Sequence, residues 1–542
     1  MKNILIAIRS IFKKGRHNVM KIVSLGIGLA VGLVLIAKVY FEQSYDDFYP
    51  DRDRVYQVWA KYQQKGGELK DYPQTSGGIA PTMQQQIPEI ETVTRYTSFG
   101  DWTFTMTDTK MKYSGRCIIA DSCFFDILPR PMLIGNAKEV LSTPMYVLIS
   151  SRIAKNIGGD VIGKNFTVDN SPGRTMTIGG VFEEVPENSH SRYDVIVSMA
   201  SAGRFMWEGS PTNMLGNDRY ISYVKLHKGV NPLALEEQVR TFVNSYFPPE
   251  EQQKVGLSID FSFHKLDNLH KELPQVKRMT WILSLLAFAL IFTAVMNYIL
   301  IVISSIVNRS KEVAVHKCYG ASENNIHGMM FGEALVHIVL SLILALLLIL
   351  AFRGTVEELL ATSLDSLLLS NGSLVLLGIC ILVFFVSGFM PGSLYARIPV
   401  ASAFRNYREN KRIWKKALLL VQFVATGFLV TMLVFVARQY TFMVNDRPGY
   451  AYENLAYCGL AGVDSTSRAK ILDEVMRLPG VAAATTVYQL PFEHASGNNI
   501  LLPGGTQELF NIADLYWVGN GYLDMMEIPV IQGRSFTELS LI

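Results

Sequence analysis

The chain has 542 residues, of which 49% are hydrophobic and 18% are charged. Ordinary soluble domains carry roughly 25% charged residues, so this composition favours membrane spans and excludes an intrinsically disordered chain. A formal net charge of +3 excludes a strongly basic nucleic-acid-binding protein, and five cysteines in this length exclude a disulfide scaffold.

Five segments are apolar for long enough to cross a bilayer, which takes about 20 residues. None contains Asp, Glu, Lys or Arg, and they run over residues 22–37, 281–307, 334–352, 373–390 and 417–437. The first segment is short, but Lys21 and Lys38 at its ends can extend their ammonium groups to the lipid headgroups. No small-residue cleavage site follows it, so the pattern predicts a retained anchor rather than a cleaved signal peptide.

Basic residues predict the side of the membrane on which each segment lies. Residues 1–21 and residues 397–416 each carry a net charge of +6, and the positive-inside rule places both in the cytoplasm. With five spans, three net-negative segments then lie outside, namely residues 42–278, 353–372 and 438–542. The sequence therefore predicts a multi-pass protein of the inner membrane with a cytoplasmic N-terminus.

The predicted fold class is an α-helical transmembrane bundle with a large α+β domain outside the membrane. Period-two alternation at residues 54–59 and 176–178 indicates strands, while the patterns over residues 81–87 and 231–247 indicate helices. The predicted parts are a basic N-terminus (1–21), span 1 (22–41), the outside domain (42–278), spans 2 to 4 with their cytoplasmic loop 308–327 (279–396), a basic linker (397–416), span 5 (417–437) and the start of a second outside domain (438–542).

One glycine-rich segment has the spacing of a phosphate-binding loop. In residues 158–165, Gly-Gly-Asp-Val-Ile-Gly-Lys-Asn, Asn165 replaces the Ser or Thr that would hold Mg²⁺. The segment precedes a predicted strand, whereas a phosphate-binding loop opens a helix. We therefore interpret it as a glycine turn.

The chain contains an internal repeat. Residues 121–135 align without gaps with residues 519–533, and a basic segment, a span and an outside domain recur in the same order. Three identical pairs mark the alignment: Asp126 with Asp524, Pro131 with Pro529, and Gly135 with Gly533. A repeat of this length indicates two copies of one design. Because the second copy stops early, we expect a truncated chain that lacks three further spans.

Several motifs, in this order and with this topology, resemble those of one family. The motifs are residues 26–32, 45–50, 54–56, 179–182, 186–190, 309–322 and 388–395. They resemble the permease subunits of ABC transporters of the MacB, LolC and FtsX group, in the duplicated form found in Bacteroidetes. Residues 309–322 follow the family pattern R-x-x-E-I-x-x-R-K-x-x-G-A-S, although His316 stands where Arg is usual.

The resemblance implies a non-catalytic subunit that transmits the movement of a separate cytoplasmic ABC ATPase dimer to the outside domains, and so exports or extracts peptides, drugs or lipoproteins. It also implies contact with a second permease half or a missing C-terminal repeat, with a periplasmic adaptor or outer-membrane partner, and with membrane lipids. An alternative function is a membrane-anchored sensor or scaffold that binds a ligand without transport. An adjacent ATPase gene would favour transport over sensing.

The loop at residues 308–327 is the predicted site of contact with the ATPase. We expect a short amphipathic helix from Lys311 to Tyr319, closed by Gly320 as its C-terminal cap. Spacing alone favours a plain helix at the membrane surface, and the resemblance favours coupling to the ATPase. The predicted coupling residues are Arg309, Lys311, Glu312, Val313, Ala314, His316, Lys317, Gly320, Ala321 and Ser322.

Small and polar residues within the spans are predicted to serve helix packing. Gly28 and Gly32 form a Gly-x-x-x-Gly pair that permits close approach, either within the bundle or at a dimer seam. We expect Asn297 and His337 to face the bundle and to form hydrogen bonds there, and Glu333 to lie at the interface near basic residues.

The sequence offers no catalytic, cofactor-binding or metal-binding set. No cluster of His, Cys, Asp and Glu has metal-ligand spacing, and no nucleophile and base can be paired, which disfavours a membrane enzyme. Cys117 and Cys123 lie on the predicted outer side, where they either pair or stay free.

Overall fold

The computed structural model describes residues 17–64, 68–168, 171–216, 218–369, 372–400, 413–445, 449–460, 463–491, 496–502 and 508–535. The basic N-terminal residues 1–16 and the linker residues 401–412, which support the predicted orientation, lie outside this described part. The chain divides into two compact units, residues 1–168 with 174–431, and residues 169–173 with 432–542.

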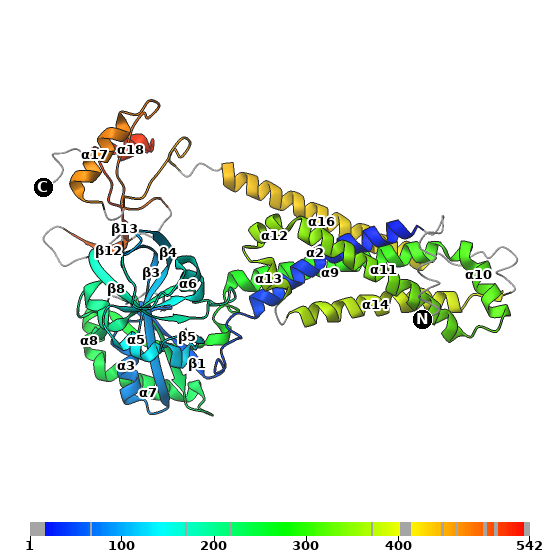
Figure 1. Cartoon of the computed structure of the whole chain (residues 1–542), viewed down its shortest axis with the longest axis horizontal. Helices are drawn as coiled ribbons and strands as arrows, with labels where there is room; N and C mark the ends of the chain where they lie inside the picture. Colours follow the sequence, from blue (N-terminus) through cyan, green and yellow to red (C-terminus); the bar gives the residue numbers. More distant parts are fainter. Residues whose placement is uncertain are drawn as a thin grey trace. The chain divides into compact units, whose positions relative to one another are not determined.

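Five helices in the described part are long and apolar enough to cross a membrane (Figure 1). They are α2 (Asn18–Gln43), α9 (Pro274–Ser304), α11 (Glu323–Ala351), α14 (Ser373–Ala396) and α16 (Ile413–Asn445). All five predicted spans are thus present as helices, and most extend beyond their apolar runs. The extension is expected, because a helix that leaves hydrocarbon keeps its backbone hydrogen bonds and needs no apolar side chains.

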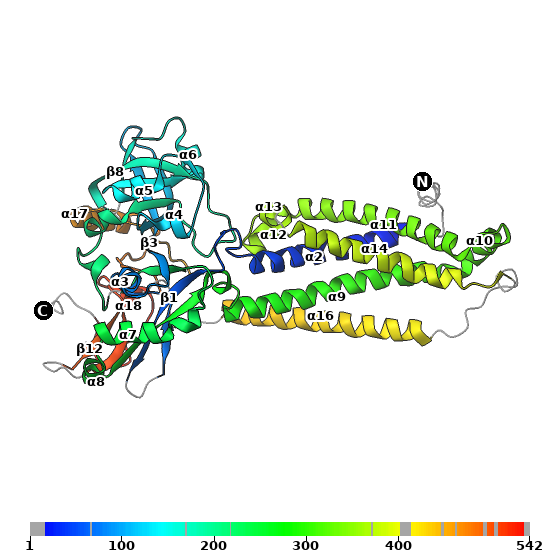
Figure 2. The same cartoon turned by 90° about the horizontal axis from the view of Figure 1, so that it is seen from below.

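Helix α2 packs against both α9 and α11, and α11 packs against α14 (Figure 2). Gly28 and Gly32 lie against α9, where an added Cβ would stand 2.2 Å from the Ala294 side chain and 2.4 Å from that of Ile291. This close approach is within the chain. Short helices complete the bundle: α10 (Ile306–Cys318), α12 (Arg353–Leu360) and α13 (Leu364–Leu368).

The expectation for Asn297 is wrong. Its neighbours Met296 and Tyr298 are buried, but Asn297 itself is exposed on the outer face of α9. The residues that face the bundle recur every three or four positions along α9, and Asn297 falls between two of them. A polar residue type alone therefore does not identify the inward face of a span.

The large domain, residues 44–273, contains an eleven-stranded sheet. Its strands are β1 (Val55–Gln64), β2 (Lys70–Tyr72), β3 (Ile90–Met106), β4 (Lys112–Ala120), β5 (Met132–Ile134), β6 (Tyr146–Ser150), β7 (Asn165–Val168), β8 (Ser171–Phe182), β9 (Val195–Ser198), β10 (Ile221–Leu226) and β11 (Leu257–Lys265). The order is β11-β1-β10-β3-β4-β9-β6-β8-β5, with β2 beside β1 and β7 beside β3 and β8. Only β4–β9 and β6–β8 are parallel pairs among the described strands.

Helices cover this sheet and complete the predicted α+β domain. They are α3 (Ile79–Gln86), α4 (Phe124–Ile127), α5 (Ala137–Ser142), α6 (Ser151–Ile157), α7 (Glu236–Tyr246) and α8 (Pro249–Val255), with 3₁₀ turns η1 (Met199–Arg204), η2 (Ser210–Thr212), η3 (Pro232–Leu235) and η4 (Leu266–Asn268). Val239, Phe242 and Val243 of α7 are buried in a core with β1, β10 and β11, as the helical spacing predicts.

The glycine-rich segment and the cysteines have plain structural roles in this domain. Gly158, Gly159 and Gly163 have φ between +66° and +77° and form the turn between α6 and β7, so the interpretation as a glycine turn is confirmed. Cys117 is buried, Cys123 is half-buried, and both are free thiols.

The second unit repeats local structure of the large domain. It contains α17 (Ser465–Met476), β12 (Ser496–Leu501), β13 (Glu508–Leu515) and α18 (Tyr522–Met525). Helix α18 begins and ends 398 residues after α4, and Gly135 and Gly533 both have positive φ, +85° and +92°. The short helix and the glycine that follows it therefore match between the two copies, which supports the internal repeat, whereas the residues before the helix differ, with φ −90° at Cys123 and +75° at Gly521.

Candidate functional site

Helix α10 lies between the second and third spans, in the predicted coupling loop. It begins at Ile306, directly after α9 ends at Ser304, so it is one turn longer than predicted. The predicted start at Lys311 is too late because the helix continues from α9 after a break at Ser305 and needs no start signal of its own. The Ser305 hydroxyl donates to the carbonyl of Val302 at 2.6 Å, which satisfies a backbone acceptor at the break.

The Gly-Ala-Ser sequence at residues 320–322 ends α10 and starts α11. Gly320 has φ +86° and its N–H donates to the carbonyl of Lys317, while the N–H of Ala321 donates to the carbonyl of His316. These two bonds form a Schellman motif, which requires a left-handed residue. The Ser322 side chain then accepts from the N–H of Asn325 as the N-cap of α11. The predicted glycine cap is confirmed.

The two faces of α10 have different surroundings. Val313 and Ala314 are each 1% exposed and belong to the core of the bundle, whereas Tyr319 is 89% exposed. The other outward residues are Lys311, Val315, His316 and Cys318. Val315 therefore lies on the exposed face, whereas its neighbours Val313 and Ala314 lie on the buried face. Tyr319 is also on the exposed face, and the sequence analysis did not assign it as a coupling residue.

Lys317 and Arg309 point toward the bundle rather than to the exposed face. The Lys317 ammonium donates to the carbonyls of Ala396 and Ile398, at 2.7 and 2.8 Å, and so ties α10 to the end of α14. Arg309 is 6% exposed, and like Val313 and Ala314 it is a predicted coupling residue that lies inside the bundle. Its guanidinium lies over the ring of Tyr395, 5.5 Å from the centroid.

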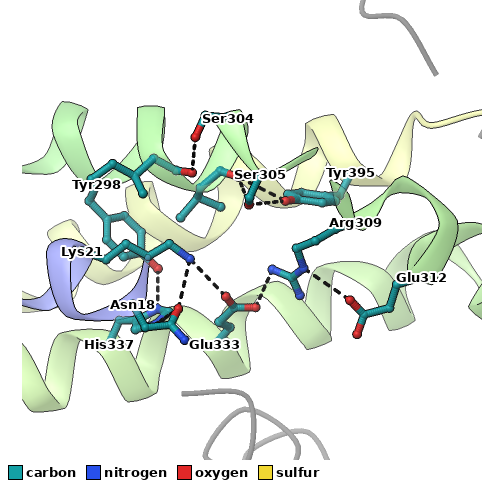
Figure 3. Close-up of polar contacts among 12 residues, drawn as sticks. Asn18, Lys21, Tyr298, Ser304, Ser305, Arg309, Glu312, Glu333, His337 and Tyr395 are labelled. Carbon is teal, nitrogen blue, oxygen red and sulfur yellow. Dashed lines mark hydrogen bonds and ion pairs between the residues drawn. The ribbon is translucent and has the colours of Figure 1, made fainter. Parts of the chain in front are cut away.

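A buried ion cluster joins three elements around Glu333 (Figure 3). One carboxylate oxygen, Oε2, accepts from Arg309 Nη1 of α10 at 2.8 Å, and the other, Oε1, accepts from Lys21 Nζ of α2 at 3.5 Å. The three side chains are at most 8% exposed. Arg309 also pairs with Glu312, at 3.5 Å, at the half-buried edge of the cluster. Two carboxylates therefore balance two cations, which limits the cost of burying charge.

A second set of hydrogen bonds continues from the ion cluster along the bundle. His337 Nε2 lies 3.2 Å from the side-chain oxygen Oδ1 of Asn18, and His337 Nδ1 lies 3.2 Å from the Tyr298 hydroxyl. Lys21 Nζ donates to the same Asn18 Oδ1. The prediction that His337 is hydrogen-bonded inside the bundle is confirmed. Glu333 lies near basic residues, as expected, but it is buried among helices instead of lying at the interface.

At the other end of α2, polar contacts join the helix to both α12–α13 and the chain that enters α9. Lys38 bonds Glu42 at 2.7 Å and the Thr362 hydroxyl at 2.8 Å, and Glu42 bonds His270 at 2.5 Å. The Tyr45 ring stacks on the His270 ring at 3.4 Å. The ends of the first and second spans that adjoin the large domain are therefore fixed to one another.

The segment after α2 is anchored in the large domain by Asp46. This residue is fully buried, and it accepts from the Ser189 hydroxyl and from His190 Nδ1, the latter at 2.7 Å. His190 Nε2 lies 3.0 Å from the Ser191 hydroxyl, which gives an acid, base and nucleophile in a row that sequence reasoning missed. However, Ser191 is 4% exposed and its hydroxyl also bonds that of Tyr96. The row is closed to a substrate and serves as an anchor.

The described residues contain no group of three His, Cys, Asp or Glu side chains arranged to hold a metal ion. What the fold defines is a multi-pass membrane protein whose first two spans are separated by a large α+β domain.

Comparison with known families agrees with this class. Residues 20–242 match the MacB-like periplasmic core domain, and residues 284–400 match the FtsX-like permease C-terminal domain. The two matches together cover more than half of the chain in the family's order. The chain therefore belongs to the MacB/FtsX-like ABC transporter permeases.

Three solved structures are similar to the large domain. A domain of a permease-like protein of Porphyromonas gingivalis is 33% identical over 40% of this chain and 91% of its own, with a TM-score of 0.37. The periplasmic region of MacB from Actinobacillus actinomycetemcomitans is 14% identical over 41% and 92%, and the extracellular domain of the ABC-type transporter YknZ from Gram-positive bacteria is 11% identical over 38% and 98%. Both have TM-scores of 0.27. No curated protein matches the chain.

Proposed function

We propose that this chain is the permease subunit of an ABC transporter that transmits the movement of a separate cytoplasmic ATPase dimer to the large domain in the periplasm. It lies in the inner membrane with its N-terminus in the cytoplasm. ATP hydrolysis takes place in the partner, and the work done outside is export or extraction of peptides, drugs or lipoproteins. Family membership supports the permease class, and the geometry of α10 supports the coupling role.

The observation that carries this proposal is the firm attachment of α10 combined with its exposed face. Its apolar residues Val313 and Ala314 are already buried against protein, so they are not available to enter lipid. This disfavours a helix that merely lies on the membrane surface. Three attachments restrain the helix: Ser305 at its start, Lys317 at α14, and the Gly320 turn at its end.

The exposed face of α10 suits a protein partner. Tyr319 offers a large aromatic surface, Lys311 and His316 are polar or basic, and Val315 adds an apolar contact that is 43% exposed. Interfaces concentrate binding energy in a few aromatic and basic residues, with Tyr among the most frequent. A force applied at Tyr319 would pass to α9, α11 and α14 through the attachments just described.

Co-purification of the chain with its partner tests the proposal. The full-length protein, tagged and expressed from its native locus, is expected to retain an ABC ATPase whose hydrolysis rate rises in its presence. Tyr319→Ala should weaken the association by about 2 kcal/mol, roughly a 30-fold change in Kd. Tyr457→Ala is a matched control, because Tyr457 is also highly exposed, at 79%, but lies in the second unit.

Two results would overturn the proposal. The first is that no ABC ATPase co-purifies with the wild-type chain, which would leave the sensor or scaffold as the better hypothesis. The second is that Tyr319→Ala and Tyr457→Ala retain equal amounts of ATPase and equal stimulation. In that case the docking surface would have to be sought elsewhere on the cytoplasmic side.

A further inference from the structure

Two segments of the polypeptide connect the large domain to the spans: one follows α2 and the other precedes α9. Helix α10 is continuous with α9 through Ser305, but it has no covalent connection to α2 nearby in the sequence. A displacement of α10 therefore reaches one connection directly. Contacts must carry it to the other. Glu42 and His270 form such a contact at the outer end, so the inner end needs a contact of its own.

Glu333 is the side chain that provides such a contact. Its two carboxylate oxygens hold cations from different helices, Arg309 of α10 and Lys21 of α2 (Figure 3). Both cations come from the first turns of their helices, so the contact joins the inner ends of α2 and α10. This contact could not be predicted from the sequence, because Lys21 and Glu333 are 312 residues apart.

Burial makes this contact resistant to separation. The side chains of Lys21, Arg309 and Glu333 are 1%, 7% and 8% exposed, so a cation drawn away from Glu333 would leave an uncompensated charge inside the bundle. Breaking a buried pair on one side is far more costly than having no pair at all. Movement of Arg309 is therefore favoured only if Glu333 and Lys21 follow.

We propose that Glu333 is a positioning residue that ties α2 to α10, so that both connections of the large domain move together when α10 is displaced. This inference rests on the proposed function, since it takes α10 as the element that the ATPase moves. Hydrogen bonds from His337 to Asn18 and Tyr298 reinforce the same arrangement by joining α11 to α2 and α9.

Lys21→Met is the variant that separates coupling from folding. It removes the ion pair between Glu333 and α2 but leaves Arg309 and Glu333 as a balanced buried pair, so the bundle is expected to stay folded. Glu333→Gln is unsuitable as the main test, because it would leave two buried cations without their common partner. Lys21→Arg keeps the charge, and Lys416→Met removes an exposed lysine at the corresponding end of α16.

The experiment uses the full chain with the ATPase that co-purifies with it. The Lys21→Met chain should stimulate ATP hydrolysis by the ATPase to within twofold of the wild-type stimulation, because α10 stays attached to α14 and α11. The nucleotide-dependent change in amide hydrogen exchange at residues 38–54 should become smaller than in the wild type, because Glu42–His270 is then the remaining ion pair between the two connections described above. Lys21→Arg and Lys416→Met should retain both properties. An unchanged exchange response in Lys21→Met would overturn the inference, and so would loss of the response in Lys416→Met.

A second measurement needs no ATPase and separates failure of this inference from failure of the proposed function. In the purified chain, Lys21→Met should raise amide exchange in the first three turns of α2, because it removes the ion pair that holds α2 to Glu333. Lys21→Arg should leave this exchange as in the wild type. If Lys21→Met leaves α2 exchange unchanged, the link does not exist, whatever the ATPase does.

Discussion

Gly28 allows α2 to pack closely on α9, and the structure indicates what a single added methyl group would do. A Cβ at position 28 would stand 2.2 Å from the Cβ of Ala294. Carbon atoms in contact are about 3.5–4.0 Å apart, so Gly28→Ala requires the helices to separate by roughly 1.5 Å at this point. Overpacking of this kind costs about 1–3 kcal/mol.

Moving the methyl group from one helix to the other should reverse the effect. With Ala294→Gly, the nearest remaining atoms to the new Cβ are the Leu290 carbonyl oxygen at 3.5 Å and the residue 294 Cα at 3.6 Å, which are ordinary contacts. The helix propensity gained at position 28 and lost at position 294 nearly cancels. The double variant is therefore expected within about 1 kcal/mol of the wild type.

To test this prediction, the protein is heated in detergent and then analysed by size-exclusion chromatography. The quantity measured is the midpoint, the temperature at which half of the monodisperse peak is lost. Gly28→Ala should lower the midpoint and the double variant should restore it. Gly378→Ala is the control, because a Cβ at Gly378 in α14 meets none of the described atoms within 4 Å. A midpoint for Gly28→Ala equal to that of the wild type would refute the close packing of α2 on α9. So would a double variant no more stable than the single one.

Three other predictions concern the cap of α11, the orientation and the anchor in the large domain. Ser322→Ala should destabilise the start of α11 by about 1 kcal/mol, seen as faster amide exchange in its first turn and not in its last. In intact cells, an impermeant maleimide should label a chain that keeps only Cys458 and should spare one that keeps only Cys318, both of which are exposed; the opposite pattern would reverse the proposed topology. Asp46→Ala should destabilise the large domain by about 1–3 kcal/mol, because it removes the acceptor of the ring Nδ1 and of the backbone N–H of His190, whereas an unchanged thermal midpoint would exclude the anchoring role.

The spans could be predicted from the sequence because hydrocarbon imposes a simple requirement. Residues in the bilayer core avoid charge and their backbone groups bond within the helix, so each apolar run forms helix, although most of the helices extend beyond the run. The Gly320 cap could also be predicted, since a left-handed residue is a local requirement. Both features depend on residues close together in the chain.

The interior of the bundle could not be predicted in the same way. Arg309 belongs to a motif that suggests an exposed loop, yet it is buried, because the charges that balance it are Glu333 and Glu312. Asn297 was expected inside and is exposed. Which face of a helix turns inward depends on the neighbouring helices, and a single sequence does not specify these.

The segment between α2 and β1 is short, so a tilt of α2 would also move β1. From Lys21 to Gln43 the helix rises about 33 Å, so a tilt of about 5° around its inner end would shift its outer end by about 3 Å. Residues 44–54 contain no glycine, and a succession of turns ties them together, with the N–H of Asp46 donating to the carbonyl of Asn188 at 2.9 Å. Because this segment has little slack, a tilt of that size would displace the start of β1 by a similar distance.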